Sequence, residues 1–269
     1  MDILRVSSVQ SDIVWENVEE NLHRKQRDIE CLSGKTDLVI LPEMFTTGFT
    51  MNVGQYDRTI TTYTIETIQK WSDKYRMAIT GSIIAYENGD YYNRGFFITP
   101  DRAPQYYDKK HLFRIGREGE FFTAGNERLI VQYQGWNIAL FVCYDLRFPV
   151  WLRNVNNEYD ILLIVANWPQ SRSYAWKQLL IARAIENSCY VCGVNRIGED
   201  GTQSKYSGDS MILDMKGYPL VSARNCHSRT LFVEITIIPA KFSVLAGQRQ
   251  IFFTVNIVFR QKNIRKGIT

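Results

Sequence analysis

The stretch Trp136–Val142 is the sequence feature that most limits how this chain can fold. It is an almost uninterrupted apolar run, WNIALFV, and Cys143 follows it at once. A run of this kind is typical of a strand that is buried on both faces in an α/β sheet. Such strands end at the sheet edge, where α/β proteins usually hold their ligands. The thiol of Cys143 is therefore predicted to lie at a strand end.

The residues after Cys143 are typical of a helix start. Pro149 suits the first turn of a helix, so a helix is predicted after Arg147. The unpaired amide groups and the dipole of a helix N-terminus would favour a thiolate. The alternative is an inert core thiol, because free cysteine is among the most buried residue types.

Further apolar runs and amphipathic segments alternate along the whole chain. Strands are predicted at residues 3–10, 37–42, 77–85, 91–99, 105–107, 129–133, 136–142, 161–166, 189–195, 210–214 and 231–235, and helices at 16–32, 63–75 and 173–187. No linker or low-complexity stretch interrupts this order. The pattern predicts one α/β domain with mixed strand directions.

The charge and cysteine content narrow the possible partners and compartment. The net charge is +4, and the chain after residue 235 is basic without any Asp or Glu, which predicts a solvated tail rather than a nucleic-acid-binding surface. No apolar run approaches the roughly 20 residues of a membrane span, and the N-terminus lacks a signal-peptide pattern. The five cysteines show no disulfide-like spacing. We expect a soluble cytoplasmic protein without nucleic-acid or membrane partners.

Reactive side chains recur just past predicted strands. Glu43 follows the apolar run LVILP, Lys110 follows YYDK, and Cys143 follows ALFV. If these strands share one layer, a carboxylate base, an ammonium group and a thiol nucleophile could converge. That combination is suited to acyl transfer.

Other candidate sites are weaker. Cys189 and Cys192 lie three apart in a predicted strand, so they point to opposite faces and are expected to be core residues. His111 could orient the loop beside Lys110 or be a plain structural residue. His23 and His227 have no partner pattern, and no glycine-rich phosphate loop is present. We therefore expect no metal or nucleotide cofactor.

Three segments resemble motifs of the nitrilase superfamily, the carbon–nitrogen hydrolases. LPEMFTTGF at 41–49 is similar to its glutamate motif, YDKKHLF at 107–113 to its lysine motif, and VCYDLRFP at 142–149 to its cysteine motif. The motifs occur in the order found in the family. The variants MFTTGF, VANWP at 165–169 and ARAIEN at 182–187 resemble the omega-amidase branch. The resemblance implies a four-layer α-β-β-α sandwich with mixed sheets, and hydrolysis of non-peptide C–N bonds without a metal.

The resemblance also implies a role for each motif residue. Cys143 would attack an amide carbonyl, and Glu43 would take the thiol proton. Lys110 and the backbone N–H of Tyr144 would hold the oxyanion. A second glutamate would assist; its position after Lys110 favours Glu118, with Glu120 as the rival.

Some residues near these motifs are candidates for the substrate pocket. Trp168 could form a pocket wall or be a core residue. Arg147 could bind a substrate carboxylate, or it could pair with Asp145 or Glu186 and serve only the fold. Other cations that could bind a substrate carboxylate are Arg172, Arg183 and Arg196.

The sequence therefore predicts a hydrolase domain at residues 1–240 and a divergent basic tail at 241–269. The predicted activity is hydrolysis of a small amide to acid and ammonia through a cysteine thioester. The branch resemblance favours monoamides such as 2-oxoglutaramate or 2-oxosuccinamate, and a homodimer. The alternatives are a general aliphatic amidase, a nitrilase, an N-carbamoyl amide hydrolase, or a catalytically silent binding protein with the same fold.

Overall fold

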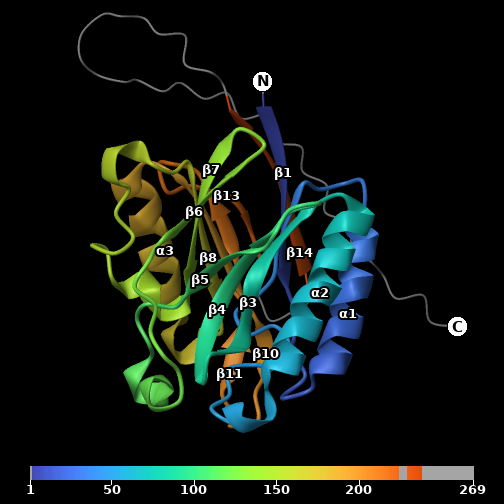
Figure 1. The fold of residues 1–269 in the computed structure, drawn as a ribbon. Helices are drawn as coiled ribbons and strands as arrows, with labels where there is room; N and C mark the ends of the chain where they lie inside the picture. Colours follow the sequence, from blue (N-terminus) through green and yellow to red (C-terminus); the bar gives the residue numbers. More distant parts are fainter. Residues whose placement is uncertain (1, 224–228, 238–269) are drawn as a thin grey trace, which may run out of the picture.

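Two β-sheets stack face to face between layers of helices. The computed structural model describes residues 2–223 and 229–237. Helices α1 (Val18–Leu32) and α2 (Arg58–Tyr75) cover one sheet, and α3 (Ser173–Asn187) covers the other (Figure 1). This arrangement is the four-layer α-β-β-α sandwich that the sequence predicted.

Each main sheet has six strands and a mixture of parallel and antiparallel neighbours. The first has the order β14-β1-β2-β3-β4-β5, and the second has the order β13-β12-β9-β8-β7-β6. The strands of the first sheet are β1 (Asp2–Gln10), β2 (Leu38–Ile40), β3 (Ala78–Glu87), β4 (Asp90–Ile98), β5 (Gln105–Asp108) and β14 (Arg229–Ile237). Those of the second are β6 (Leu129–Tyr133), β7 (Trp136–Val142), β8 (Ile161–Ala166), β9 (Tyr190–Asn195), β12 (Met211–Leu213) and β13 (Pro219–Ser222).

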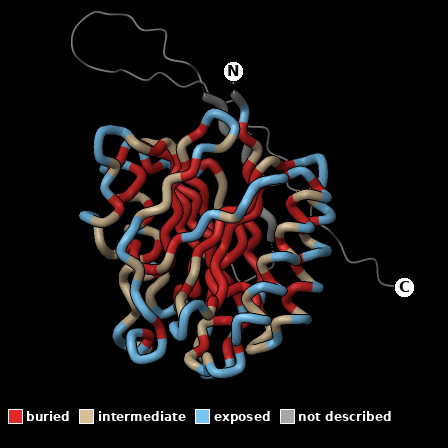
Figure 2. The backbone as a smooth tube through the Cα atoms, viewed as in Figure 1, coloured by how far each residue is buried: buried red, intermediate tan, exposed pale blue. Residues whose placement is uncertain are grey.

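The main core lies between the two sheets. Leu38 and Ile40 of β2 point into it, whereas Val39 and Leu41 belong to the core under α1 and α2. This alternation follows from the two-residue period of a strand. Strands β7 and β8 are apolar at almost every position because both of their faces are covered, and Figure 2 shows the buried backbone concentrated in these central strands.

The helix predicted after Arg147 does not form. The chain makes a short 3₁₀ turn, η4 (Cys143–Arg147), and continues through turns to η5 (Val155–Asn157). Phe148 precedes Pro149 and adopts φ −114°, ψ 85°. A residue before proline is disfavoured in the α region, so the turn ends at this point instead of extending into a helix.

Several short elements were not predicted. Strands β10 (Ile197–Glu199) and β11 (Lys205–Ser207) form a small ribbon, and β13 was also missed. Strands of three or four residues are too short to show the alternation of apolar and polar residues that identifies a strand in the sequence. The remaining 3₁₀ turns are η1 (Val53–Gln55), η2 (Arg114–Gly116), η3 (Glu118–Glu120) and η6 (Gln170–Arg172).

The predicted basic tail at 241–269 lies outside the described residues, as do Cys226 and His227. Within the described part of the chain, every helix is too short or too polar to cross a membrane.

Candidate active site

The ends of three strands bring a carboxylate, an ammonium group and a thiol together. Glu43 follows β2, Lys109 follows β5 and Cys143 follows β7. The Lys109 Nζ atom lies 2.9 Å from Glu43 Oε1. Asn167 links the other two groups, because its backbone N–H donates to Glu43 Oε2 and its carbonyl oxygen lies 4.0 Å from the Cys143 sulfur. The predicted convergence of Glu43 and Cys143 is therefore present in the structure.

The lysine that the structure places beside Glu43 is Lys109, one residue before the predicted Lys110. Lys109 is fully buried, whereas the Lys110 ammonium group lies over the ring of Trp151, 5.5 Å from its centre. Tyr107 and Lys109 lie on the same face of the chain as it leaves β5, and both are buried. Because side chains alternate across a strand, Lys110 points away from the site.

Of the two glutamates considered for the second position, the structure places Glu118 beside Lys109, and Glu120 lies elsewhere. Glu118 is fully buried at the start of η3, and its carboxylate lies 3.0 Å from Lys109 Nζ. The backbone N–H of Phe113 also donates to Glu118, at 2.6 Å. Glu120 is exposed and forms an ion pair with Arg117.

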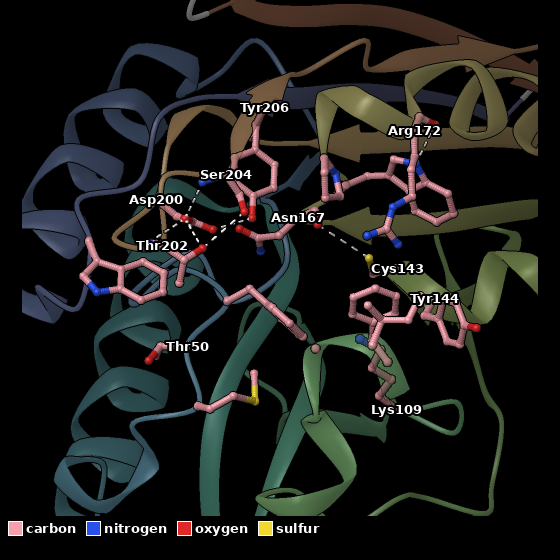
Figure 3. Close-up of a pocket in the computed structure, with 18 of the residues that line it drawn as sticks. Thr50, Lys109, Cys143, Tyr144, Asn167, Arg172, Asp200, Thr202, Ser204 and Tyr206 are labelled. Atoms are coloured by element: carbon pink, nitrogen blue, oxygen red, sulfur yellow. Dashed lines mark hydrogen bonds between the residues drawn. The ribbon is translucent and has the colours of Figure 1, made fainter.

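Cys143 has an unusual backbone conformation. Its φ is +46°, in the left-handed region that side chains other than glycine rarely adopt. The sulfur lies 4.0 Å from the Asn167 carbonyl oxygen, and Figure 3 shows this contact beside the pocket. Cys143 is also the first residue of η4, so the N–H groups that open this turn, including that of Tyr144, have no acceptor within it.

The surroundings of Cys143 favour the thiol over the thiolate. Burial raises the pKa of Cys143 well above its usual value, and the Glu43 carboxylate raises it further, while Lys109 opposes the effect. The sequence-based expectation of a stabilised thiolate is therefore wrong, because a five-residue 3₁₀ turn beside a buried carboxylate replaces the expected helix. A base must remove the proton as the sulfur attacks.

Lys109 is held as an ammonium ion between two carboxylates. Burial alone would lower its pKa, but Glu118 and Glu43 outweigh that effect and raise it. Burial raises the pKa of Glu118, and Lys109 partly offsets the rise. The site thus contains one fixed cation that can stabilise negative charge.

Two asparagines in the site were missed by the sequence analysis as functional residues. The Nδ2 atom of Asn93, on β4, donates to Glu43 Oε1 at 2.7 Å and to Glu118 Oε1 at 2.9 Å. Asn167, after β8, donates its backbone N–H to Glu43 Oε2 at 2.7 Å. The sequence feature that could have revealed Asn93 is a polar residue on the buried face of a strand that is rich in aromatic residues.

Asp145 ties the lysine loop to the cysteine turn. Its buried carboxylate accepts hydrogen bonds from the Tyr107 hydroxyl, at 2.7 Å, and from the backbone N–H of His111, at 2.9 Å. The His111 ring lies on that of Phe148, with 3.6 Å between the ring centres, and its Nδ1 atom is 2.8 Å from Asp145. His111 therefore orients the loop, which was one of the two expected roles.

Replacing Asp145 by alanine is expected to lower the free energy of unfolding by about 3 kcal/mol. The change leaves the buried Tyr107 hydroxyl and the loop amides without their acceptor. Urea unfolding followed by circular dichroism would measure the effect. Asp90→Ala, at an exposed hairpin position, is the control. Equal stability of the two variants would contradict this role for Asp145.

A pocket of about 400 Å³ opens beside Cys143. Trp168 forms part of its wall and is also buried against Trp176, so both expected roles apply. Arg147 and Arg172 line the pocket, with their guanidinium groups over the rings of Trp168 and Phe113. Within the described residues, neither guanidinium has a carboxylate partner.

The other candidate arginines serve the fold. Arg183 is buried, and it pairs with Glu186 and donates to the Leu146 carbonyl. Arg196 is buried and pairs with Asp12. Neither of these two arginines lines the pocket.

An acidic group lies in another part of the pocket wall. Asp200 accepts hydrogen bonds from Thr202, Ser204 and Tyr206, which are drawn together in Figure 3. Burial opposes its ionisation, but the hydrogen bonds from Thr202 and Tyr206 lower the pKa of Asp200. An anionic group of a ligand is therefore better placed toward Arg147 and Arg172 than toward this wall.

Cys189 and Cys192 are buried and unbridged, as predicted for core residues. Among the described residues, no three His, Cys, Asp or Glu side chains are grouped to hold a metal ion.

The stacked sheets, and the cysteine, glutamate and lysine at their strand ends, define the nitrilase superfamily. The family model for carbon–nitrogen hydrolases matches residues 5–237. The chain belongs to the carbon–nitrogen hydrolase family and is an enzyme of the amidase type.

Related proteins agree with this assignment. An omega-amidase YafV of Yersinia enterocolitica is 40% identical over 237 residues, covering 88% of this chain and 91% of that protein. A 2-oxoglutaramate amidase of Bacillus subtilis is 32% identical over 216 residues, covering 79% and 83% of the two chains. The crystal structure of XC1258 from Xanthomonas campestris, a CN-hydrolase superfamily protein with an arsenic adduct in its active site, matches with a TM-score of 0.84 at 43% identity, covering 88% and 91%.

Proposed function

We propose that this protein is an omega-amidase, which hydrolyses the terminal amide of a short dicarboxylate monoamide such as 2-oxoglutaramate or 2-oxosuccinamate. The observation that carries the proposal is a pair of unpaired guanidinium groups, Arg147 and Arg172, in the pocket that Cys143 lines. They are suited to bind the carboxylate at the far end of such a substrate. The names of the relatives from Yersinia enterocolitica and Bacillus subtilis support the same substrate class.

The reaction begins with attack of the Cys143 sulfur on the amide carbon while Glu43 takes the thiol proton. Lys109 and the backbone N–H of Tyr144 stabilise the negative oxygen of the tetrahedral intermediate. The C–N bond then breaks, and the proton on Glu43 passes to the leaving nitrogen to give ammonia. The thioester that remains is hydrolysed by water, from which Glu43 takes a proton that is returned to the sulfur.

Glu118 supports this cycle without exchanging a proton with the substrate. Its carboxylate lies 3.0 Å from the Lys109 Nζ atom and, together with Glu43, holds the ammonium group in place. Lys109 can then face the developing oxyanion while it stays fully charged.

A comparison of three substrates tests the proposed substrate class. We expect kcat/KM for 2-oxoglutaramate and succinamate to exceed that for butyramide by about 10–150-fold, the equivalent of one charged hydrogen bond of about 1.5–3 kcal/mol. Ammonia release with purified protein is the measurement. Equal turnover of butyramide would instead indicate a general aliphatic amidase.

Substitution of the two pocket arginines is expected to remove that preference. Arg147→Met and Arg172→Met keep most of the side-chain stem but lose the charge, so kcat/KM for the acids should fall while that for butyramide changes little. Arg102→Met, at an exposed position, is the matched control. If the ratio of kcat/KM for the acids to kcat/KM for butyramide stays at the wild-type value in both pocket variants, the carboxylate is bound elsewhere.

We further propose a cytoplasmic homodimer, with the hydrolase domain at residues 1–240 and a separate tail at 241–269. The support is the family resemblance of the sequence and the uneven placement of its basic residues. Sedimentation of the full chain beside a chain ending at residue 240 would test both the dimer and the division.

A further inference from the structure

The buried amide of Asn93 lies between the two glutamates of the active site. Its Nδ2 atom donates one hydrogen bond to Glu43 Oε1, at 2.7 Å, and one to Glu118 Oε1, at 2.9 Å. Lys109 Nζ lies 2.9 Å and 3.1 Å from the same two oxygen atoms. Two donors, one charged and one neutral, therefore bridge the same pair of carboxylates.

The orientation of this amide is fixed from the other side. Ser82, on β3, donates its hydroxyl hydrogen to Asn93 Oδ1 at 2.9 Å, and its Oγ accepts the backbone N–H of Met44 at 2.9 Å. A flipped amide would place its oxygen against two carboxylates, and the Ser82 hydroxyl hydrogen would lose its acceptor. Asn93 is thus held as a donor toward the glutamates.

The bonding leaves the two oxygens of Glu43 unequal. Oε1 accepts from Lys109 and Asn93, whereas the backbone N–H of Asn167 is the only donor to Oε2 among the described residues. A proton taken from the Cys143 thiol is therefore better placed on Oε2, which has the free acceptor capacity.

We propose that Asn93 is a positioning residue that holds Glu43 and Glu118 in their working orientation and directs the proton of Cys143 to Oε2 of Glu43. It acts through the glutamates and does not touch the substrate. The proposal rests on the amidase activity proposed above.

The effect on turnover depends on the charges that surround Asn93. The ionisable groups that contact it are Glu43 after β2 and Glu118 on η3, and the groups that act on these carboxylates are Lys109 after β5 and Cys143 after β7. Two carboxylates and one ammonium ion leave this buried group with an excess of negative charge. A neutral donor stabilises that charge without adding a cation that would compete with Lys109.

Asn93→Asp tests the proposal by replacing the donor with a carboxyl of nearly equal size. At neutral pH the new carboxylate faces two others, and we expect kcat to fall by about 10²-fold because Glu43 is displaced. Like charges and burial raise the pKa of the new carboxyl. As the pH falls through that pKa, the group becomes neutral and can donate one O–H, so kcat should partly recover. Wild-type kcat should show no such recovery in acid.

Asn93→Leu and Asn187→Asp complete the comparison. The leucine removes both donors without adding charge, so its kcat should be low at every pH, with no recovery in acid. Asn187 is a buried asparagine that accepts from the backbone of Asn154, and its replacement should leave kcat and its pH profile unchanged. Thermal unfolding of each variant separates loss of function from loss of the fold. Wild-type kcat and pH dependence in both Asn93 variants would overturn the proposal.

Alkylation of Cys143 by iodoacetamide provides a readout that needs no substrate. Mass spectrometry of the Cys143 peptide should show slower alkylation in Asn93→Asp than in wild type at neutral pH, because an added negative charge disfavours the thiolate. If alkylation responds in this way but the wild type releases no ammonia from monoamides, the proposed activity is wrong and the role of Asn93 stands. If ammonia is released and alkylation is unchanged in the variant, the role of Asn93 is wrong.

Discussion

Replacing Cys143 by alanine is expected to abolish ammonia release from 2-oxoglutaramate, with kcat falling by at least about 10⁴-fold. Cys143 is the only cysteine among the described residues that lines the pocket, and the Glu43 carboxylate acts on the pKa of its thiol. Without the sulfur no thioester can form, and the remaining groups provide only binding and charge stabilisation. The fold should persist, because the change removes one buried atom. Circular dichroism and ammonia release measure the two effects.

Cys31→Ala is the matched control, since Cys31 is exposed on α1 and has no contact with the site. It should turn over substrate like the wild type. Cys226, in the segment outside the described residues, should also be dispensable. Full activity of Cys143→Ala, or loss of activity in Cys31→Ala, would contradict the assignment of the nucleophile.

Lys109→Met is expected to lower kcat by about 10²–10³-fold while KM changes much less. In the proposed mechanism the ammonium group stabilises the oxyanion, whose negative charge develops only in the transition state and the intermediate. Lys110→Met should stay close to the wild type, because the Lys110 side chain lies over Trp151 instead of facing Glu43. Steady-state kinetics of the two variants compare neighbouring lysines within one loop.

Stability must be measured alongside these rates. Removing Lys109 leaves two buried carboxylates without their shared cation, which can cost about 3–5 kcal/mol. A folded Lys109→Met protein with a normal kcat, or a large loss of kcat in Lys110→Met, would contradict the assignment of the lysine.

Most of the strands, and the positions of Glu43 and Cys143 in the site, could be predicted because they follow from local patterns of apolar residues in the sequence. The apolar runs of β7 and β8 identify buried strands, and Glu43 and Cys143 follow strands whose ends meet. The lysine was misplaced because two lysines are adjacent in the sequence. The spacing from Tyr107, whose buried ring lies on the same face as Lys109, contained the information needed to choose between them.

The rest of the site depends on contacts between distant parts of the chain. Asn93 reaches Glu43 and Glu118 only because β4 lies between β3 and β5 in the sheet. The roles of four arginines could not be separated from sequence either. Arg183 and Arg196 find acceptors within the fold, whereas Arg147 and Arg172 find none among the residues that the structure describes, and packing decides each outcome.

The pairing of β1 with β14 has a consequence for how the chain folds. Asp2 lies opposite Ile237 and Gln10 opposite Arg229, so nearly the whole described chain separates the two partners. Closing a loop of this size is entropically costly, and contacts of such high sequence separation slow folding. During synthesis, β1 is made first and must wait for β14 with one edge unpaired. Until then, β1 presents a free strand edge, which makes the incomplete chain prone to association and dependent on rapid completion or on chaperones.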